Sequence, residues 1–239
     1  MKLLSIDSSS SLLYAAVCDD DTVYCSRSEA DMKQSELVIE IIDSLMTKAS
    51  IQREELQGVL CTEGPGSFTG LRIGFSAAKS LALALSIPFT PVPTLDCIAS
   101  GIKRITKNND VQDERIIRMP VIQARKTSFF FAFFNEEERI TQDKEMSATE
   151  IEDEIMNMFN FNKDRIFITG PASSALCDSF SGSMRKENNI ILSNFENVNY
   201  ASEAITIAKK RNLLDNDNTA YLYSSPAYLR LTDAERKLT

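Results

Sequence analysis

The fold is indicated most clearly by one glycine-rich stretch, Thr62-Glu63-Gly64-Pro65-Gly66-Ser67-Phe68-Thr69-Gly70-Leu71-Arg72. Five of the eight glycines of the chain lie in or beside it: Gly58, Gly64, Gly66, Gly70 and Gly74. An apolar run that predicts a strand precedes it, Leu56–Cys61, and one that predicts a helix follows it, Leu71–Leu85. Glycine permits positive φ and close backbone approach. We therefore expect a tight strand-to-helix turn, with Gly66 and Gly70 at positive-φ positions.

This loop has two interpretations. Amide groups at a helix N-terminus attract anions, which would make the stretch a phosphate loop. However, no Gly-Lys-Ser/Thr follows Gly70, and the glycine after Gly64-Pro65-Gly66 comes one residue too late for G-x-G-x-x-G. The spacing favours a structural turn and leaves the ligand loop open.

Outward from the loop, the pattern predicts strands and helices in alternation. An antiparallel meander is expected from Lys2–Ile6, Leu12–Cys18 and Thr22–Ser26. A helix capped by Ser35 should run to about Ala49, and Ile87–Pro93, with its three prolines, should be an extended segment at the edge of a sheet or leaving it. A meander followed by helical crossovers predicts a mixed sheet.

The second half begins again with strands after a polar segment at Lys103–Asp113. Strands are expected at Met119–Ala124, Ser128–Asn135, Ile166–Thr169 and Ile190–Leu192, and helices near Ala148–Phe159, Ser173–Ser181 and Ser202–Asn212. The phenylalanine-rich run 129–134 lacks interleaved basic residues, so it predicts a buried strand, not a base-stacking platform. We predict two units, residues 1–104 and a smaller α/β unit of residues 105–239, with a C-terminal tail that can return to the first.

The composition excludes several kinds of chemistry. The 239 residues include no histidine, which removes Ser-His-Asp triads, Cys-His pairs and histidine metal sites. We predict no catalytic residue and no metal ligand. The net charge of −8 also argues against direct binding of nucleic acid by this chain alone.

The cysteine pattern predicts reduced thiols in the cytoplasm, because the five cysteines are odd in number and form no C-x-x-C. The N-terminal apolar run ends at Asp7, too early for a signal peptide, and no window of about 18 apolar residues occurs. We therefore expect no membrane association.

Three blocks carry a resemblance to a known family: Leu4-Ser5-Ile6-Asp7-Ser8-Ser9, Glu63 to Gly74, and Pro91-Val92-Pro93-Thr94-Leu95-Asp96. Their order and spacing resemble the TsaB (YeaZ) family. The resemblance is strong over residues 1–100, weaker over 117–135 and faint beyond, apart from Pro226-Ala227-Tyr228-Leu229-Arg230. It implies an actin-like (ASKHA) two-lobed α/β fold, with mixed sheets and flanking helices.

The resemblance implies a non-catalytic subunit of the complex that forms N6-threonylcarbamoyladenosine in tRNA. Such a subunit dimerises with the catalytic paralogue TsaD, works with the ATPase TsaE, meets tRNA only through the complex and self-associates when alone. No cofactor is expected in the isolated chain, while a nucleotide at the partner interface stays open. The alternative is a small-molecule kinase of the same superfamily, with Asp7 as base or metal anchor; a peptidase is disfavoured by the absence of histidine.

The same resemblance identifies a vestigial nucleotide loop. Catalytic relatives place a glycine next to an acidic residue in each phosphate-binding hairpin, whereas serines follow Asp7 here. The loop candidates are Asp7, Gly64, Gly66, Ser67, Thr69, Gly70 and Arg72. The chain also departs from the family pattern at Gln34, where a histidine is frequent, and at Gln123, where an aspartate is usual.

The two helices of the first unit carry more apolar positions than one core-facing stripe needs. Either both helices are enclosed by the fold, or one face of each packs against a partner. The resemblance points to the second interpretation. The predicted partner surface comprises Leu37, Ile41, Leu45, Leu71, Phe75, Ala78 and Ala82.

Overall fold

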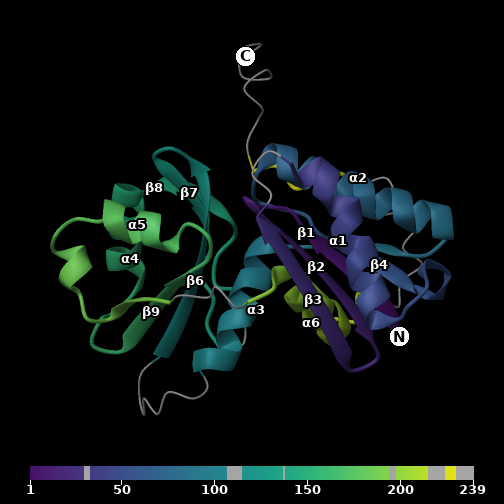
Figure 1. Cartoon of the computed structure of the whole chain (residues 1–239). Helices are drawn as coiled ribbons and strands as arrows, with labels where there is room; N and C mark the ends of the chain where they lie inside the picture. Colours follow the sequence, from purple (N-terminus) through teal and green to yellow (C-terminus); the bar gives the residue numbers. More distant parts are fainter. Residues whose placement is uncertain (30–32, 107–114, 137, 194–197, 215–223, 230–239) are drawn as a thin grey trace.

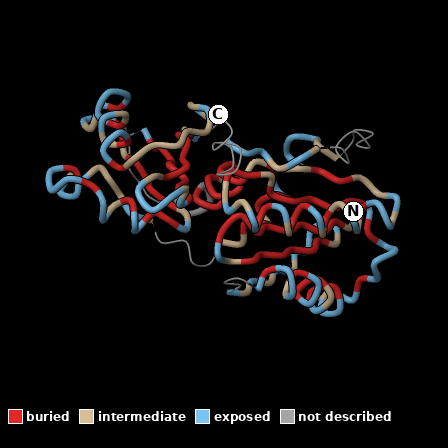
Figure 2. Tube along the Cα trace, turned by 90° about the horizontal axis from the view of Figure 1, so that it is seen from above, coloured by how far each residue is buried: buried red, intermediate tan, exposed pale blue. Residues whose placement is uncertain are grey.

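The computed structural model describes residues 1–29, 33–106, 115–136, 138–193, 198–214 and 224–229. Two mixed five-stranded sheets form the centres of two lobes that lie side by side (Figure 1). Figure 2 shows the buried residues concentrated along the central strands, with exposed turns around them. Among the helices of the described residues, none has the length and apolar character that a membrane span requires.

The first sheet has the strand order β3-β2-β1-β4-β5. Its strands are β1 (Lys2–Asp7), β2 (Leu12–Asp19), β3 (Thr22–Glu29), β4 (Gly58–Thr62) and β5 (Phe89–Val92). The pairs β3-β2 and β2-β1 are antiparallel, whereas β1-β4 and β4-β5 are parallel. The predicted meander is confirmed, and the proline-rich segment lies at the edge of the sheet, one of its two predicted positions.

The second sheet repeats this plan with the order β8-β7-β6-β9-β10. Its strands are β6 (Arg115–Arg125), β7 (Ser128–Phe131), β8 (Lys144–Ser147), β9 (Asp164–Thr169) and β10 (Ile190–Leu192). The helices follow in the same chain order in both halves: α1 (Gln34–Ala49), α2 (Phe68–Leu85) and α3 (Thr94–Thr106), then α4 (Ala148–Met158), α5 (Ser173–Ser179) and α6 (Tyr200–Lys210). The chain therefore contains two topologically equivalent halves.

The inner strands of the first sheet, β1, β2 and β4, bury both of their faces, whereas the edge strand β3 is half-buried to exposed. In β1, Leu4 and Ile6 join the core that α1 and α2 cover, while Leu3 joins the core on the opposite face. This alternation is the period of two that a pleated strand imposes. The opposite core contains residues of α3 and α6 together with Phe130 and Phe134 of the second half, so it is shared between the lobes.

The phenylalanine-rich run is buried, as predicted. Phe129, Phe131 and Phe133 pack into the core that α4 and α5 cover, and Phe130 and Phe134 pack into the core shared with the first sheet. Alternate side chains of one segment therefore serve two different cores.

The C-terminal helix α6 returns to the first sheet. Asn199 caps it by accepting a hydrogen bond from the Ser202 backbone N–H at 3.0 Å. Its Nδ2 also donates to the backbone oxygens of Ala15, at 3.3 Å, and Ser26, at 2.9 Å. One side chain thus ends the loop, starts the helix and fixes the helix to β2 and β3.

One local prediction was wrong, and two elements were not predicted. Ser35 does not cap α1, because the helix already begins at Gln34 and its N-cap position is Lys33. No helix was predicted at α3, although Leu95, Ile98, Ala99 and Ile102 are all buried at helical spacing. The short strand β8 was not predicted either. The predicted boundary between residues 104 and 105 stays a prediction, since most of the polar segment around it is outside the described residues.

Candidate functional site

The glycine-rich loop between β4 and α2 packs on the turn that follows β1. We call Ser8–Ser10 the serine turn. The Ser67 backbone N–H donates to the Ser9 carbonyl at 2.7 Å, and Ser8 Oγ donates to the Gly70 carbonyl at 2.8 Å. From α1, Gln34 Nε2 donates to the Ser10 carbonyl at 2.6 Å. Three segments that are distant in sequence therefore meet at this turn.

Gly66 and Gly70 are required by this contact. A Cβ on Gly70 would lie 2.0 Å from the Ser8 carbonyl oxygen, and one on Gly66 would lie 2.4 Å from that of Ser9. Neither distance is possible for a real side chain. Positive φ was the predicted reason for glycine at these two positions, and that prediction was wrong. In the described chain the glycines with positive φ are Gly64 and Gly170. Close backbone approach, not backbone conformation, selects glycine here.

Gly64 is held from two other directions. Its backbone N–H donates to Thr94 Oγ1 at 3.0 Å, so the third sequence block positions the loop. A Cβ on Gly64, whose φ is 119°, would lie 2.6 Å from the Ala227 carbonyl oxygen. The Ala227 N–H in turn donates to the Glu63 carbonyl at 2.7 Å. The C-terminal segment thus closes over the loop.

The same C-terminal segment, residues 224–229, lies along α2. Lys79 Nζ donates to the Ser224 carbonyl at 2.6 Å, and Arg72 Nε donates to the Tyr228 hydroxyl at 3.2 Å. The Tyr228 and Phe68 rings are 4.7 Å apart, and the Arg72 guanidinium carbon lies 4.0 Å from the centre of the Phe68 ring. Arg72 is therefore engaged within the chain.

Asp7 is fully buried at the end of β1. Its Oδ1 accepts hydrogen bonds from Thr62 Oγ1 and from the Ser9 N–H, whereas its Oδ2 has no partner among the described residues. Burial raises the pKa of Asp7 above its ordinary value of 3.8, against the opposing effect of the Thr62 and Ser9 hydrogen bonds. Its environment thus favours the neutral carboxyl group.

The other loop candidates have simple roles in the structure. Ser67 caps α2 by accepting from the Gly70 N–H at 3.2 Å, and Thr69 is exposed on the first turn. Gln34 is buried against the serine turn. Gln123 lies away from this cluster, on the second hairpin, where it donates to the Ser128 carbonyl at 3.3 Å.

The proposed partner set needs a correction in its choice of residues. Six of its members are buried in the core of the chain itself: Ile41, Leu45, Leu71, Phe75, Ala78 and Ala82. Leu37 is half-buried. Helical periodicity identified apolar faces but could not distinguish the face that meets the sheet from the face that meets solvent. The partner role of the two helices stays a prediction, and their exposed apolar residues include Ile39 and Leu83.

An ion bridge between the lobes was not predicted from the sequence. Asp96, near the start of α3, pairs with Arg139 of the second lobe and with Arg211 after α6, whose Nη2 lies 2.6 Å from Oδ1. Arg139 pairs in addition with Asp143. Asp96 lies at the end of the third sequence block, and its place in that block was the one feature of the sequence that could have indicated its importance.

Comparison with known proteins shows which family the chain resembles. The family model described as TsaD, tRNA N6-adenosine threonylcarbamoyltransferase, matches residues 28–237. The tRNA threonylcarbamoyladenosine biosynthesis protein TsaB of Escherichia coli is 24% identical over 239 residues, which is 100% of this chain and 98% of that protein. The TsaB of Bacillus subtilis is 32% identical over 102 residues, 42% of this chain and 44% of its own.

The chain belongs to the TsaB (YeaZ) branch of the TsaD family.

Solved structures confirm the actin-like fold. YeaZ from Pseudomonas aeruginosa superposes with a TM-score of 0.70 at 16% identity and covers 95% of this chain and 99% of its own. A second Pseudomonas aeruginosa structure, described as an uncharacterized protein with similarity to peptidase YEAZ, gives a TM-score of 0.74 at 16% identity, with coverage of 96% and 99%. The ethanolamine utilization protein EutJ from Carboxydothermus hydrogenoformans gives 0.51 at 11% identity, with coverage of 87% and 90%.

The loop contact predicts a large difference between two glycine substitutions. Gly70→Ala should lower the free energy of unfolding by about 2–4 kcal/mol, because its methyl group meets the Ser8 backbone. Gly182→Ala is the matched control, since nothing lies within 4 Å of a Cβ there, and it should change stability by less than about 0.5 kcal/mol. Urea denaturation measures both. Equal stabilities of the two variants would contradict the packing role of Gly70.

Burial of Asp7 predicts a pH dependence. A carboxyl group whose pKa is raised by folding keeps its proton where the unfolded chain has lost it, so its contribution to stability falls as the pH rises above 3.8 and on through the raised pKa. Asp7→Asn cannot ionise and should not show this loss. The stability of the variant relative to the parent chain should therefore increase from pH 4 to pH 8 in urea titrations. If the difference in unfolding free energy between the variant and the parent chain stayed constant or decreased, ionisation of Asp7 would not destabilise the fold, contrary to this prediction.

Proposed function

We propose that the chain is a non-catalytic subunit of the complex that forms N6-threonylcarbamoyladenosine in tRNA, where it pairs with a catalytic TsaD subunit. The observation that carries this proposal is the filled glycine-rich loop. The backbone of the serine turn packs against the glycines at distances that exclude even a methyl group from Gly66 and Gly70, so a phosphate would have no room on that side of the loop. The family relationship supplies the pathway, since relatives are named for this modification.

The arrangement supports a scaffold over the kinase alternative. A kinase with Asp7 as base or metal anchor needs this carboxylate ionised and open to substrate, whereas Asp7 is fully buried and its pKa is raised by that burial. The second hairpin offers Gln123-Ala124-Arg125 in place of a carboxylate. Without histidine, the general acids and bases available for other chemistry are few.

The outer faces of α1 and α2 are the surface that we assign to TsaD and, in its absence, to a second copy of the chain. The two helices pack together over one face of the first sheet and share its core. Beyond Arg72, the exposed residues of α2 are uncharged: Ser76, Ser80, Leu83 and Ala84. Ile39 of α1 and Leu83 of α2 are 52% and 66% exposed. The low charge that is typical of an interface core is therefore a property of α2, whereas the exposed residues of α1 include Glu36, Glu40 and Lys48.

The remaining partners follow from this assignment. TsaE is expected to meet the chain only through the complex. The same is expected of tRNA, since an acidic surface does not attract a polyphosphate. Any nucleotide that the complex uses is expected at the interface with TsaD or in the partner subunit, and not in the isolated chain.

Reconstitution tests the proposed function. The purified chain alone should show no ATP hydrolysis and no threonylcarbamoyl transfer, while adding it to TsaD with the other components should increase formation of threonylcarbamoyladenosine in tRNA. Mass spectrometry of digested tRNA measures the product. Turnover by the chain alone that Asp7→Ala abolishes would overturn the scaffold in favour of the kinase.

Lysine substitutions on the outer faces of α1 and α2 test the proposed binding surface for TsaD. Ile39→Lys and Leu83→Lys should each weaken TsaD binding by about tenfold or more, since a lysine buried at an interface without a partner is costly. Both parent side chains are largely exposed in the free chain, so the variants should stay folded. Met156→Lys on α4, where Met156 is 61% exposed, is the matched control. Light scattering and pull-down report association; unchanged binding by both helix variants would exclude this surface.

A further inference from the structure

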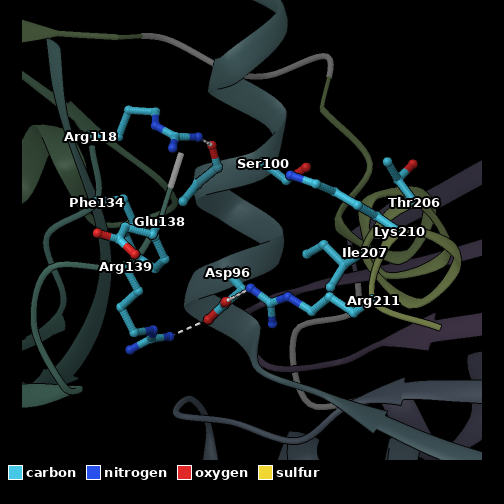
Figure 3. Close-up of a pocket in the computed structure, with 11 residues that line it drawn as sticks. Asp96, Ser100, Arg118, Phe134, Glu138, Arg139, Thr206, Ile207, Lys210 and Arg211 are labelled. Atoms are coloured by element: carbon cyan, nitrogen blue, oxygen red, sulfur yellow. Dashed lines mark hydrogen bonds and ion pairs between the residues drawn. The ribbon is translucent and has the colours of Figure 1, made fainter. Parts of the chain in front are cut away.

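A pocket lies between the two lobes, and we call it the seam pocket. It is lined by α3 on one side, by Arg118 of β6 with Phe134, Glu138 and Arg139 on another, and by the C-terminal end of α6 (Figure 3). Its volume is about 90 Å³. Since about 10–15 Å³ is enough to hold one water molecule, the seam pocket has room for a small polyatomic ion.

The lining of the seam pocket is basic, although the chain as a whole carries a net charge of −8. Its charged side chains are Arg118, Arg139, Lys210, Arg211, Asp96 and Glu138. Basic groups therefore outnumber acidic ones two to one. Behind the lining, Asp143 pairs with Arg139, and Glu203 accepts a hydrogen bond from Ser100. Among the described residues, the two lining cations without an acidic ion-pair partner are therefore Arg118 and Lys210.

Asp96 is paired within the lining itself. Both carboxylate oxygens of Asp96 are occupied, one by Arg139 and the other by Arg211 (Figure 3). Glu138 is exposed at the rim. Among the described residues, no hydrogen bond or ion pair joins either acidic side chain to Arg118 or Lys210.

Arg118 is the most unusual of the lining residues. It is only 5% exposed, and its guanidinium donates to two backbone carbonyls, of Ala99 at 2.8 Å and of Asn135. Its Nε has no partner among the described residues. The acidic groups that act on it are Glu136, which is exposed, and the already paired Asp96. The carbonyls hold the side chain in place, but they do not neutralise a buried charge.

Lys210 supplies a second cation to the lining. From the last residue of α6, its side chain extends toward Ser100 of α3 (Figure 3). The Ser100 hydroxyl itself donates to Glu203 at 2.7 Å. An ammonium group and a guanidinium with a free N–H are together the donors that phosphate and carboxylate groups accept from.

We propose that the seam pocket binds a small oxyanion, a phosphate or carboxylate group, between the Arg118 guanidinium and the Lys210 ammonium group. The volume limits the bound part to one such group, with any larger remainder outside the rim. Because Arg118 belongs to the second lobe and Lys210 to a helix packed on the first, the anion bridges the two lobes. This proposal does not depend on the role of the chain in tRNA modification.

Thermal denaturation of the full chain tests the proposal. Sodium phosphate and sodium acetate are titrated separately against sodium chloride at equal ionic strength. At ten times its dissociation constant, the preferred anion should raise the melting temperature by about 3–6 °C above chloride. The two arms distinguish phosphate from carboxylate chemistry, and saturation by either anion supports the site.

Variants locate the site. Lys210→Gln should weaken binding of the anion by about tenfold, as expected for loss of one charged hydrogen bond. Lys209→Gln is the matched control on the same helix, because Lys209 donates to the Asp20 carbonyl and does not line the pocket; it should bind as the parent chain does. Arg118→Lys, with its fold checked by circular dichroism, should also bind more weakly. No stabilisation beyond chloride by either anion, or an equal response of both lysine variants, would overturn the proposal.

Discussion

Backbone contact between the serine turn and the glycine-rich loop is the constraint on which the site depends. The Ser67 N–H and the Ser9 carbonyl are joined at 2.7 Å, and Gly66 and Gly70 leave no room for a side chain between the two segments. Because α2 starts at the loop and the turn follows β1, this contact sets how the helix sits on the sheet. Gln34 brings the start of α1 to the same point. Two glycines therefore determine the junction of β1, β4, α1 and α2.

The same constraint links the fold to the proposed function. A helix N-terminus behind a glycine-rich turn would ordinarily be an anion site, but here the chain's own carbonyl groups occupy the approach. Asp7 is buried beneath them, and residues 224–229 cover the loop from the other side. Because the chain's own backbone packs against this loop, we propose that the chain acts through a partner bound at the outer faces of α1 and α2. A fold shared with ATP-using relatives does not by itself imply their chemistry.

The sequence predicted the parts of the fold that depend on local pattern. Glycine spacing indicated the turn before α2, and alternation in β1 and β2 indicated strands, because both signals lie within a few residues of chain. The structural reason for Gly70 was not predictable, since Ser8 is its partner across more than sixty positions. Leu71 and Phe75 were assigned to a partner surface because periodicity does not distinguish a sheet from a neighbouring subunit. Asp96 was visible only as part of a motif, since its partners Arg139 and Arg211 come from two distant segments.

The central claim is that the glycine-rich loop holds the serine turn in place of a phosphate. Nuclear magnetic resonance of the isotope-labelled isolated chain, titrated with magnesium ATP, tests this claim most directly. The amide signals of Gly66, Ser67 and Gly70 should stay unchanged into the millimolar range, because these residues are packed against Ser8 and Ser9. A saturable shift of these signals, lost in Asp7→Asn, would show that the loop opens to bind nucleotide and would contradict the account.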